Sequence, residues 1–230
     1  MAPKGAKAGS QNRTKVLLVD DHPVVRNGLA QLINLQSDLA VCGEAEDVAG
    51  ALKALDQLQP EVAVIDLTLG KDIEGLELIK DIKVRFPQVA ILVLSMHDEA
   101  IYAERALRAG ARAYVMKSAA MKTMLTAIRQ VLKGEVYVSQ RMAKRILTRL
   151  SGHHPEEAKY PIDRLSDREL ELLHLIGRGL GVRQAAEILH LSVKTIESHQ
   201  TSIRKKLKLA DTSALREYAV QWVQSENQCR

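Results

Sequence analysis

Between residues 14 and 134, short apolar runs alternate five times with segments of helical periodicity, and few folds accommodate such a pattern. The runs have the length and composition of buried strands: Lys15–Val19, Ala40–Gly43, Val62–Ile65, Ala90–Leu94 and Ala113–Met116. The helical segments follow them in turn: Pro23–Leu35, Asp47–Leu58, Gly75–Arg85, Glu99–Ala109 and Met121–Leu132. Strands that alternate with helices form parallel sheets covered on both faces. Residues 14–138 are therefore predicted to form a doubly wound, five-stranded α/β domain.

Polar side chains stand directly after four of the five predicted strands. Asp20 and Asp21 follow the first strand, Asp66 the third, Ser95 the fourth and Lys117 the fifth. In an open doubly wound sheet, ligands bind at the carboxyl ends of the strands, beside the point where the strand order reverses. A flavodoxin-like order 2-1-3-4-5 places strands one and three side by side at that point. It leaves strand two, which contributes no polar residue, at an edge.

The residue types at these strand ends suit phosphoryl chemistry. A single Asp after a strand is most often a helix cap or a turn residue. Carboxylates crowded together repel each other, however, and a hard divalent cation such as Mg²⁺ relieves the repulsion. With Asp66 as nucleophile, the cation and the Lys117 ammonium would offset the added charge, and the Ser95 hydroxyl would donate to a phosphoryl oxygen. Four strand ends that supply acid, acid, hydroxyl and amine favour a functional site.

Residues 14–134 resemble the receiver domain of response regulators through the segments VLLVDDHPVVR, VAVIDLTL, ILVLSMHDE and GARAYVMK. The resemblance implies these roles: Asp66 as phosphoacceptor, Asp20, Asp21, Asp66 and the Thr68 carbonyl as Mg²⁺ ligands, Lys117 as the essential lysine, and Ser95 and Tyr114 as the switch hydroxyl and switch aromatic. The chain departs from the family after Asp66, where the usual Met-Pro is missing and Gly75 follows nine residues later instead of eight. We expect a longer, looser loop, which affects the rate and lifetime of phosphorylation more than phosphorylation itself.

From about residue 138 the strand pattern stops. Residues 139–163 read as a linker with an amphipathic helix and a polar, Pro-containing segment, and residues 164–230 read as helices only. Ser166 and Glu169 have the spacing of a capping box. A helix over 182–190, the turn Leu191-Ser192 and a helix over 193–207 have the form of a helix-turn-helix. We therefore predict a second, all-α domain.

The predicted helix over residues 193–207 has two distinct faces. Ile196, Ile203 and Leu207 form an apolar stripe. Lys194, Ser198, Thr201 and Lys205 fall on the opposite side, where short hydroxyls reach base edges and lysines hold phosphates. The charges of the two halves differ in the direction expected for a DNA-binding second domain. Residues 14–138 carry 14 Lys and Arg against 17 Asp and Glu, whereas residues 164–230 carry 11 Lys and Arg against 8 Asp and Glu. A net positive charge alone is weak support for nucleic-acid binding, but the pattern of the helix over residues 193–207 strengthens that interpretation.

Residues 165–215 resemble the LuxR/NarL-type DNA-binding domain through L-S-x-R-E, the G-x-G-x-x-x-x-A-x-x-L-x-L-S-x-x-T-I-x-x-H run and I-x-x-K-L. Both resemblances together place the chain in the NarL/FixJ class of response regulators. Membership of that class implies that the protein binds double-stranded DNA, receives its phosphoryl group from a sensor histidine kinase and is a homodimer in the active state. The candidate DNA-contacting residues are Lys194, Thr195, Glu197, Ser198, Thr201, Arg204 and Lys205. Gly181-Val182, Ala185 and Glu197 depart from the family pattern, so no base preference follows.

Other features of the sequence exclude some protein classes. No apolar run reaches 18 residues and the first 13 residues lack an apolar stretch, which predicts a cytoplasmic protein with a disordered N-terminal tail and no membrane contact. Cys42 and Cys229 lie far apart and form no metal-binding motif. None of the seven histidines has catalytic or metal-ligand spacing, so we assign them no role.

Three functions fit these patterns. The first is a phosphorylation-controlled transcription factor, which modifies itself and is not an enzyme. The second is a phosphotransferase or phosphatase with an Asp nucleophile, although such an enzyme would need a second domain over the site. The third is a DNA-binding dimer that ignores phosphorylation and uses the first domain only for dimerisation or other interactions. Turnover of a small phosphoester would favour the second, and DNA affinity that is unchanged by mutation of Asp66 would favour the third.

Overall fold

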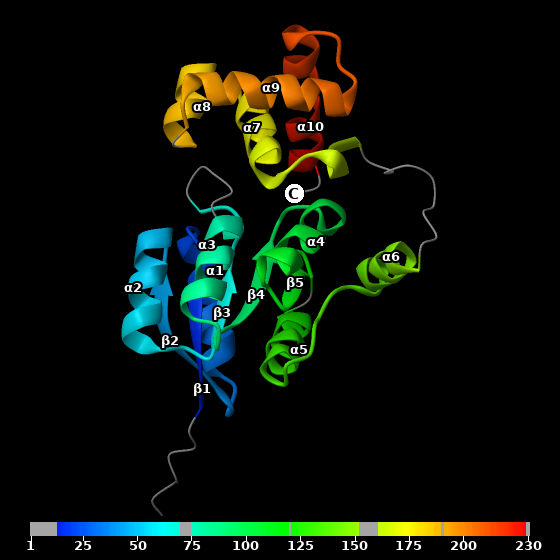
Figure 1. The fold of residues 1–230 in the computed structure, drawn as a ribbon. Coiled ribbons are helices and arrows are strands. Elements are labelled where there is room, and N and C mark those ends of the chain that lie inside the picture. The colour runs from blue at the N-terminus through cyan, green and yellow to red at the C-terminus, as the bar shows by residue number, and fades with distance from the viewer. Residues whose placement is uncertain (1–12, 70–74, 120, 152–160, 190, 229–230) are drawn as a thin grey trace, which may run out of the picture. The chain divides into compact units, whose positions relative to one another are not determined.

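The computed structural model describes residues 13–69, 75–119, 121–151, 161–189 and 191–228 (Figure 1). Most of the predicted tail, the loop at 70–74 and most of the polar linker therefore lie outside the described residues. The chain forms two compact units, of which the first contains the sheet. Residues 96–108, 116–118 and those from Val138 onward belong to the second unit. The domain boundaries given above stay predictions.

The five predicted strands form one sheet in the order β2-β1-β3-β4-β5, as predicted (Figure 1). Their bounds are β1 (Thr14–Val19), β2 (Leu39–Ala45), β3 (Val62–Ile65), β4 (Ala90–Ser95) and β5 (Ala113–Met116). β1 pairs in parallel with β2 and β3, and β3 pairs in parallel with β4. β2 is three residues longer than predicted because it pairs along the whole of β1, where the register shifts once between Val16 and Leu17.

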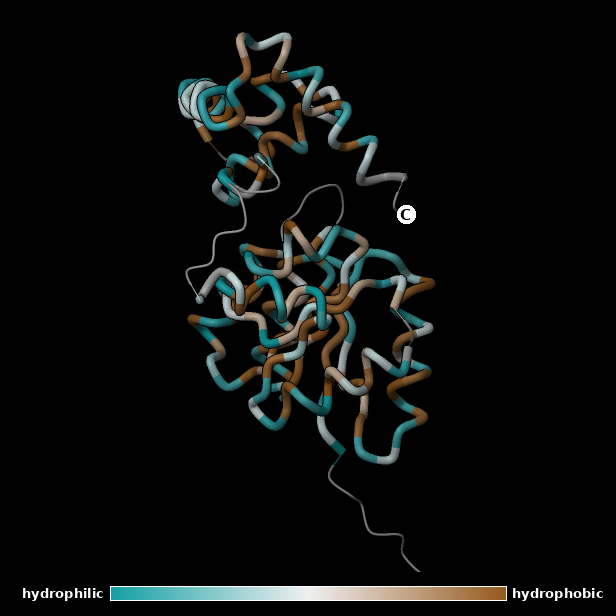
Figure 2. The backbone as a smooth tube through the Cα atoms, turned by 90° about the vertical axis from the view of Figure 1, so that its right-hand side faces the viewer, coloured by the Kyte–Doolittle hydropathy of each residue, from teal (hydrophilic) through white to brown (hydrophobic). Residues whose placement is uncertain are grey.

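The helices of the first half match their predicted positions within one residue. They are α1 (Pro23–Asn34), α2 (Val48–Leu58), α3 (Gly75–Arg85), α4 (Glu99–Ala109) and α5 (Met121–Leu132). All four residues of β3 are buried, as are all six of β4, so neither face of the central sheet meets solvent. Hydrophobic segments accordingly run through the middle of the sheet-containing unit in Figure 2. Burial on both faces is what the unbroken apolar runs in the sequence require.

From Gln140 onward, the regular elements among the described residues are all helices, as predicted. They are α6 (Gln140–Leu150), η1 (Pro161–Arg164), α7 (Asp167–Gly177), α8 (Val182–Ile188), α9 (Val193–Leu207) and α10 (Thr212–Gln228). α6 lies in the predicted linker and α7 to α10 lie in the predicted second domain. α8 ends two residues before the predicted His190, and Ser192 starts α9 by accepting a hydrogen bond from the Thr195 amide at 3.1 Å. Among the described helices, none combines the length and apolar composition needed to cross a bilayer.

Gly75 packs directly against the backbone that follows the predicted phosphoacceptor. Its amide donates to the Leu67 carbonyl at 3.0 Å, and a Cβ at this position would lie 2.5 Å from the Asp66 carbonyl oxygen and 2.6 Å from the Leu67 Cα. We therefore expect Gly75→Ala to lower the free energy of unfolding by roughly 1–3 kcal/mol, the usual cost of overpacking. Urea unfolding followed by circular dichroism measures the change.

Gly28 provides the matched control. It lies within α1, and a Cβ there would have nothing within 4 Å. Gly28→Ala should therefore raise stability by about 0.5–1 kcal/mol, because alanine loses less conformational freedom in a helix. Equal stability of the wild type and Gly75→Ala would show that the Asp66–Leu67 backbone yields without cost.

Candidate phosphorylation site and DNA-binding surface

Three aspartates meet at the carboxyl end of the sheet. Asp20 follows β1 and Asp66 follows β3, and the parallel register pairs Val19 with Ile65 immediately before them. The Asp66 amide donates to the Val19 carbonyl at 2.8 Å, which continues this pairing. Asp20 and Asp66 are buried and Asp21 is half-buried. One carboxylate oxygen of each aspartate and one ring nitrogen of His22 all lie within 4.8 Å of one another.

Short hydrogen bonds fix the backbone around these carboxylates. The His22 amide donates to Asp20 Oδ1 at 2.8 Å, and the Arg26 guanidinium donates to the Asp20 carbonyl at 2.5 Å. Arg26 is itself held by Glu44 on β2, at 3.0 Å between Nε and Oε2. The Thr68 amide donates to Asp66 Oδ1 at 3.3 Å. The aspartates are therefore held by backbone and by neighbouring strands, and their positions are largely preorganised.

The donor set fits a hard divalent cation. Asp20, Asp21 and Asp66 supply carboxylate oxygens close enough to surround one ion, and such oxygens are what Mg²⁺ prefers. Receiver-type pockets with this acidic cluster bind Mg²⁺, and the burial of Asp20 and Asp66 makes their mutual repulsion costly without a counter-charge. A role for the Thr68 carbonyl stays a prediction.

The remaining predicted site residues lie on the next two strands of the sheet. Ser95 is the last residue of β4 and is fully buried. Tyr114 is a buried residue of β5, and Lys117 follows that strand and is half-buried. β4 neighbours β3, and β5 neighbours β4. The structure thus brings the three aspartates together, whereas the switch and lysine roles of Ser95, Tyr114 and Lys117 stay predictions.

His22 is a neighbour of the cluster that the sequence analysis left without a role. Its Nδ1 lies 2.7 Å from Asp21 Oδ1 and 3.3 Å from Asp20 Oδ1. The only signal in the sequence is that it directly follows two aspartates at a strand end. Histidine spacing motifs such as H-E-x-x-H do not detect such a site, because its other donors come from the ends of separate strands.

The outward face of α9 matches the helix-wheel prediction. Lys194, Glu197, Ser198, Thr201 and Lys205 are exposed, whereas the apolar stripe of Ile196, Ile203 and Leu207 is buried. Thr195 and Arg204 are half-buried.

Two hydroxyls on α9 already have partners in the helix. Thr201 Oγ1 donates to the Glu197 carbonyl at 3.0 Å, and Thr195 Oγ1 lies 2.8 Å from Ser192 Oγ at the N-cap. Direct contact with DNA stays a prediction for all seven candidate residues.

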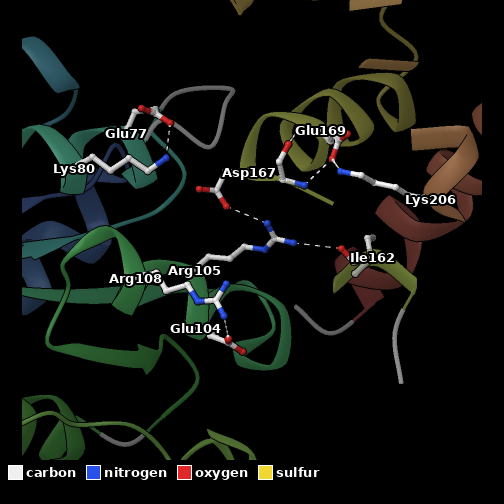
Figure 3. A network of polar contacts seen from close by, with 10 residues as sticks. Glu77, Lys80, Glu104, Arg105, Arg108, Ile162, Asp167, Glu169 and Lys206 are labelled. Carbon is white, nitrogen blue, oxygen red and sulfur yellow. Dashed lines mark hydrogen bonds and ion pairs between the residues drawn. The ribbon is translucent and has the colours of Figure 1, made fainter. Parts of the chain in front are cut away.

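Glu169 ties the start of α7 to the C-terminal half of α9 (Figure 3). Its carboxylate accepts hydrogen bonds from the Ser166 amide at 2.7 Å, from Ser202 Oγ at 2.6 Å and from Lys206 Nζ at 2.6 Å. Burial raises the pKa of Glu169, but the hydrogen bonds from Lys206, Ser202 and the Ser166 amide outweigh burial and lower the pKa to about 2. The predicted capping box is therefore present, and Glu169 also contacts Ser202 and Lys206 of α9, which the sequence pattern did not reveal.

Comparison with known proteins agrees with both halves of this architecture. The response regulator receiver domain family matches residues 16–129, and the family of bacterial regulatory proteins of the luxR type matches residues 163–219. The oxygen regulatory protein NreC of Staphylococcus haemolyticus (strain JCSC1435) is 37% identical over 209 residues, which cover 90% of this chain and 96% of NreC. The chain belongs to the NarL/FixJ class of two-component response regulators.

Solved structures that are similar to this chain include RcsB from Salmonella. One RcsB structure from Salmonella enterica serovar Typhimurium, bound to promoter rprA in the presence of phosphomimetic BeF3-, is 30% identical with a TM-score of 0.69, and covers 91% of this chain and 99% of RcsB. A second RcsB structure, from Salmonella typhimurium, is described by its conformational dynamism for DNA interaction. It is 30% identical with a TM-score of 0.71, and the match covers 91% of this chain and 98% of that RcsB chain. This response regulator thus consists of a receiver and a LuxR-type DNA-binding domain that regulates transcription.

Proposed function

We propose that phosphorylation of Asp66 switches this response regulator into a homodimer that binds specific DNA sites. The observation that carries the proposal is the meeting of Asp20, Asp21 and Asp66 at the carboxyl ends of β1 and β3. A sensor histidine kinase is the phosphodonor and the protein acts in the cytoplasm. The reaction is a single transfer onto the protein itself, so the chain is a regulator and not a turnover enzyme.

The chemistry of the transfer follows from the residues at the strand ends. An oxygen of the Asp66 carboxylate attacks the phosphorus of the donor, the bond from phosphorus to the donor nitrogen breaks, and an acyl phosphate forms. Asp20, Asp21, Asp66 and the Thr68 carbonyl would hold Mg²⁺, which would offset the charge of the phosphoryl oxygens. Lys117 contributes a positive charge, and Ser95 donates its hydroxyl to a phosphoryl oxygen.

Coupling to DNA runs through a shift between two states of the receiver. The phosphoryl group contacts Ser95 in only one arrangement, in which Tyr114 also takes a different position, so phosphorylation favours that arrangement. The favoured state dimerises, which places two copies of α9 on two half-sites of DNA. Selection of binding sites from a random DNA pool, with and without a phosphodonor, tests the proposal. Enrichment of a two-fold symmetric site only with the donor is expected; enrichment of nothing in either case would contradict it.

We expect the α9 residues to divide between base reading and phosphate binding. Ser198→Ala should cost roughly 1–3 kcal/mol at the preferred site and little on random DNA, because serine reaches base edges. Lys205→Ala should weaken binding to every sequence and lower the log–log salt slope by about one. Glu197→Ala should raise nonspecific affinity, because it removes a negative charge that faces phosphates. Thr201→Ala should cost less than Ser198→Ala, because the Thr201 hydroxyl proton is donated to Glu197.

Fluorescence anisotropy at several salt concentrations, on the selected site and on random DNA, measures these effects. Ser213→Ala is the matched control, because Ser213 is an exposed serine that lies near the start of α10 and outside α9. A change of specificity in Lys205→Ala together with wild-type behaviour of Ser198→Ala would mean that α9 docks in another orientation.

A further inference from the structure

The His22 imidazole lies beside the proposed Mg²⁺ pocket and does not cap the helix that His22 precedes. His22 is the N-cap residue of α1, yet its side chain makes no capping hydrogen bond. The next residue, Pro23, has no amide hydrogen and restricts His22 to an extended backbone, here with φ −91° and ψ 104°. The Asp20 carboxylate fixes the His22 amide at 2.8 Å. The local backbone thus holds the imidazole at the edge of the acidic cluster.

The position of the ring nitrogen suits a metal ligand. His22 Nδ1 lies between the carboxylates of Asp21, at 2.7 Å, and Asp20, at 3.3 Å. Together with Asp66, these donor atoms lie within 4.8 Å of one another. Donors bound at about 2.1 Å to one ion lie at most ~4.2 Å apart, so a spread of up to 4.8 Å needs only a small inward movement of these side chains to surround one ion. The His22 side chain is 60% exposed and is therefore able to turn toward an ion.

Imidazole changes which ion such a pocket prefers. Mg²⁺ takes oxygen ligands and keeps several waters, whereas first-row transition-metal ions gain affinity from nitrogen donors. We propose that His22 coordinates the divalent ion in this pocket and tunes it toward transition-metal ions such as Mn²⁺ over Mg²⁺. This inference rests on the proposed function, because it uses the same carboxylates. It adds a nitrogen ligand from this chain to their oxygen set.

Electron paramagnetic resonance of the full-length protein titrated with Mn²⁺ tests the inference. Electron spin echo modulation of bound Mn²⁺ should show coupling to an imidazole ¹⁴N in the wild type and lose it in His22→Gln. The Mn²⁺ affinity of His22→Gln should fall by at least the roughly 10-fold that loss of an outer-shell partner costs. Glutamine still offers an oxygen, so Mg²⁺ affinity, measured by displacement of Mn²⁺, should change far less. His199→Gln, a change in α9, is the control and should leave both signals unaltered.

The outcomes separate the two proposals. Mn²⁺ that binds, depends on Asp66 and shows no ¹⁴N coupling would overturn the role of His22 and leave the carboxylate site intact. That result would mean that His22 only orients Asp21 from outside. Wild-type coupling and affinity in His22→Gln would also overturn it. Mn²⁺ binding that is unchanged in Asp66→Asn would instead count against the proposed phosphorylation site itself.

Discussion

Asp66→Ala is expected to lose the phosphoryl adduct completely, the largest effect of any single substitution in the receiver. The reason is that Asp66 is the proposed nucleophile, whose backbone amide donates to the Val19 carbonyl and whose carboxylate accepts from the Thr68 amide within the acidic cluster. Incubation with acetyl phosphate and Mg²⁺, followed by mass spectrometry of the intact protein and its peptides, measures the adduct. Chelation of divalent ions should reduce the wild type to the level of the variant.

Asp56→Ala is the matched control for that experiment, because Asp56 is an exposed aspartate on α2. It should be modified like the wild type. Circular dichroism should show that Asp66→Ala is folded, since removing one of several crowded carboxylates relieves repulsion. An adduct at wild-type level in Asp66→Ala, or one that survives chelation, would refute the assignment of the phosphoacceptor and of the metal requirement.

Glu169→Ala should strongly destabilise the DNA-binding unit. The substitution leaves the half-buried Lys206 ammonium, the Ser202 hydroxyl and the Ser166 amide without their acceptor. Breaking a fully buried charge pair by removing one partner costs about 3–5 kcal/mol. Because solvent screens the Lys206 ammonium, whose side chain is 36% exposed, we expect the lower end of this range, about 3 kcal/mol. Thermal and urea unfolding should show this loss. Glu217→Ala, an exposed glutamate on α10, should stay within about 0.5 kcal/mol of the wild type.

The stabilisation by Glu169 should also depend on pH. Its pKa is about 2 in the folded protein and near the ordinary 4.5 in the unfolded chain. A carboxyl with a lowered pKa stabilises fully above the unfolded value and loses this contribution as pH falls toward the folded value. The stability difference between the wild type and Glu169→Gln, on the order of 3 kcal/mol at neutral pH, should therefore shrink between about pH 4.5 and 2. A difference that is constant with pH would show that the hydrogen bonds do not depend on the charge.

The fold was predictable from the sequence because its signals are local and periodic. Buried parallel strands are unbroken apolar runs, and the polar residues that end them report on the edge of the sheet where they meet. β2 was predicted too short because Glu44 looks like a strand end, although it lies in the ladder beside β1, where it binds Arg26. β2 is the edge strand of the sheet, and edge strands often carry charged residues. A search for apolar runs assigns such residues to loops.

The parts of the site that escaped prediction depend on tertiary contacts. Glu169 was predicted as a capping residue because it lies three residues after Ser166, a spacing that is visible in the local sequence. Its contacts with Ser202 and Lys206 span 33 and 37 residues, and no local pattern encodes them. A metal-binding role for His22 likewise becomes apparent only in the folded protein, where Asp66, 44 positions along the chain, lies beside Asp20, Asp21 and His22. The altered loop after Asp66 falls largely on residues 70–74, which are outside the described residues.

The most direct test of phosphorylation control is the affinity for the selected DNA site, measured by anisotropy with and without beryllofluoride. The wild type should bind more tightly with beryllofluoride by roughly 5–150-fold, which corresponds to a coupling of about 1–3 kcal/mol. Asp66→Ala should bind equally in both conditions, at the affinity of the untreated wild type. Identical wild-type curves with and without beryllofluoride, at saturating adduct, would contradict the account and favour a DNA-binding dimer that ignores phosphorylation.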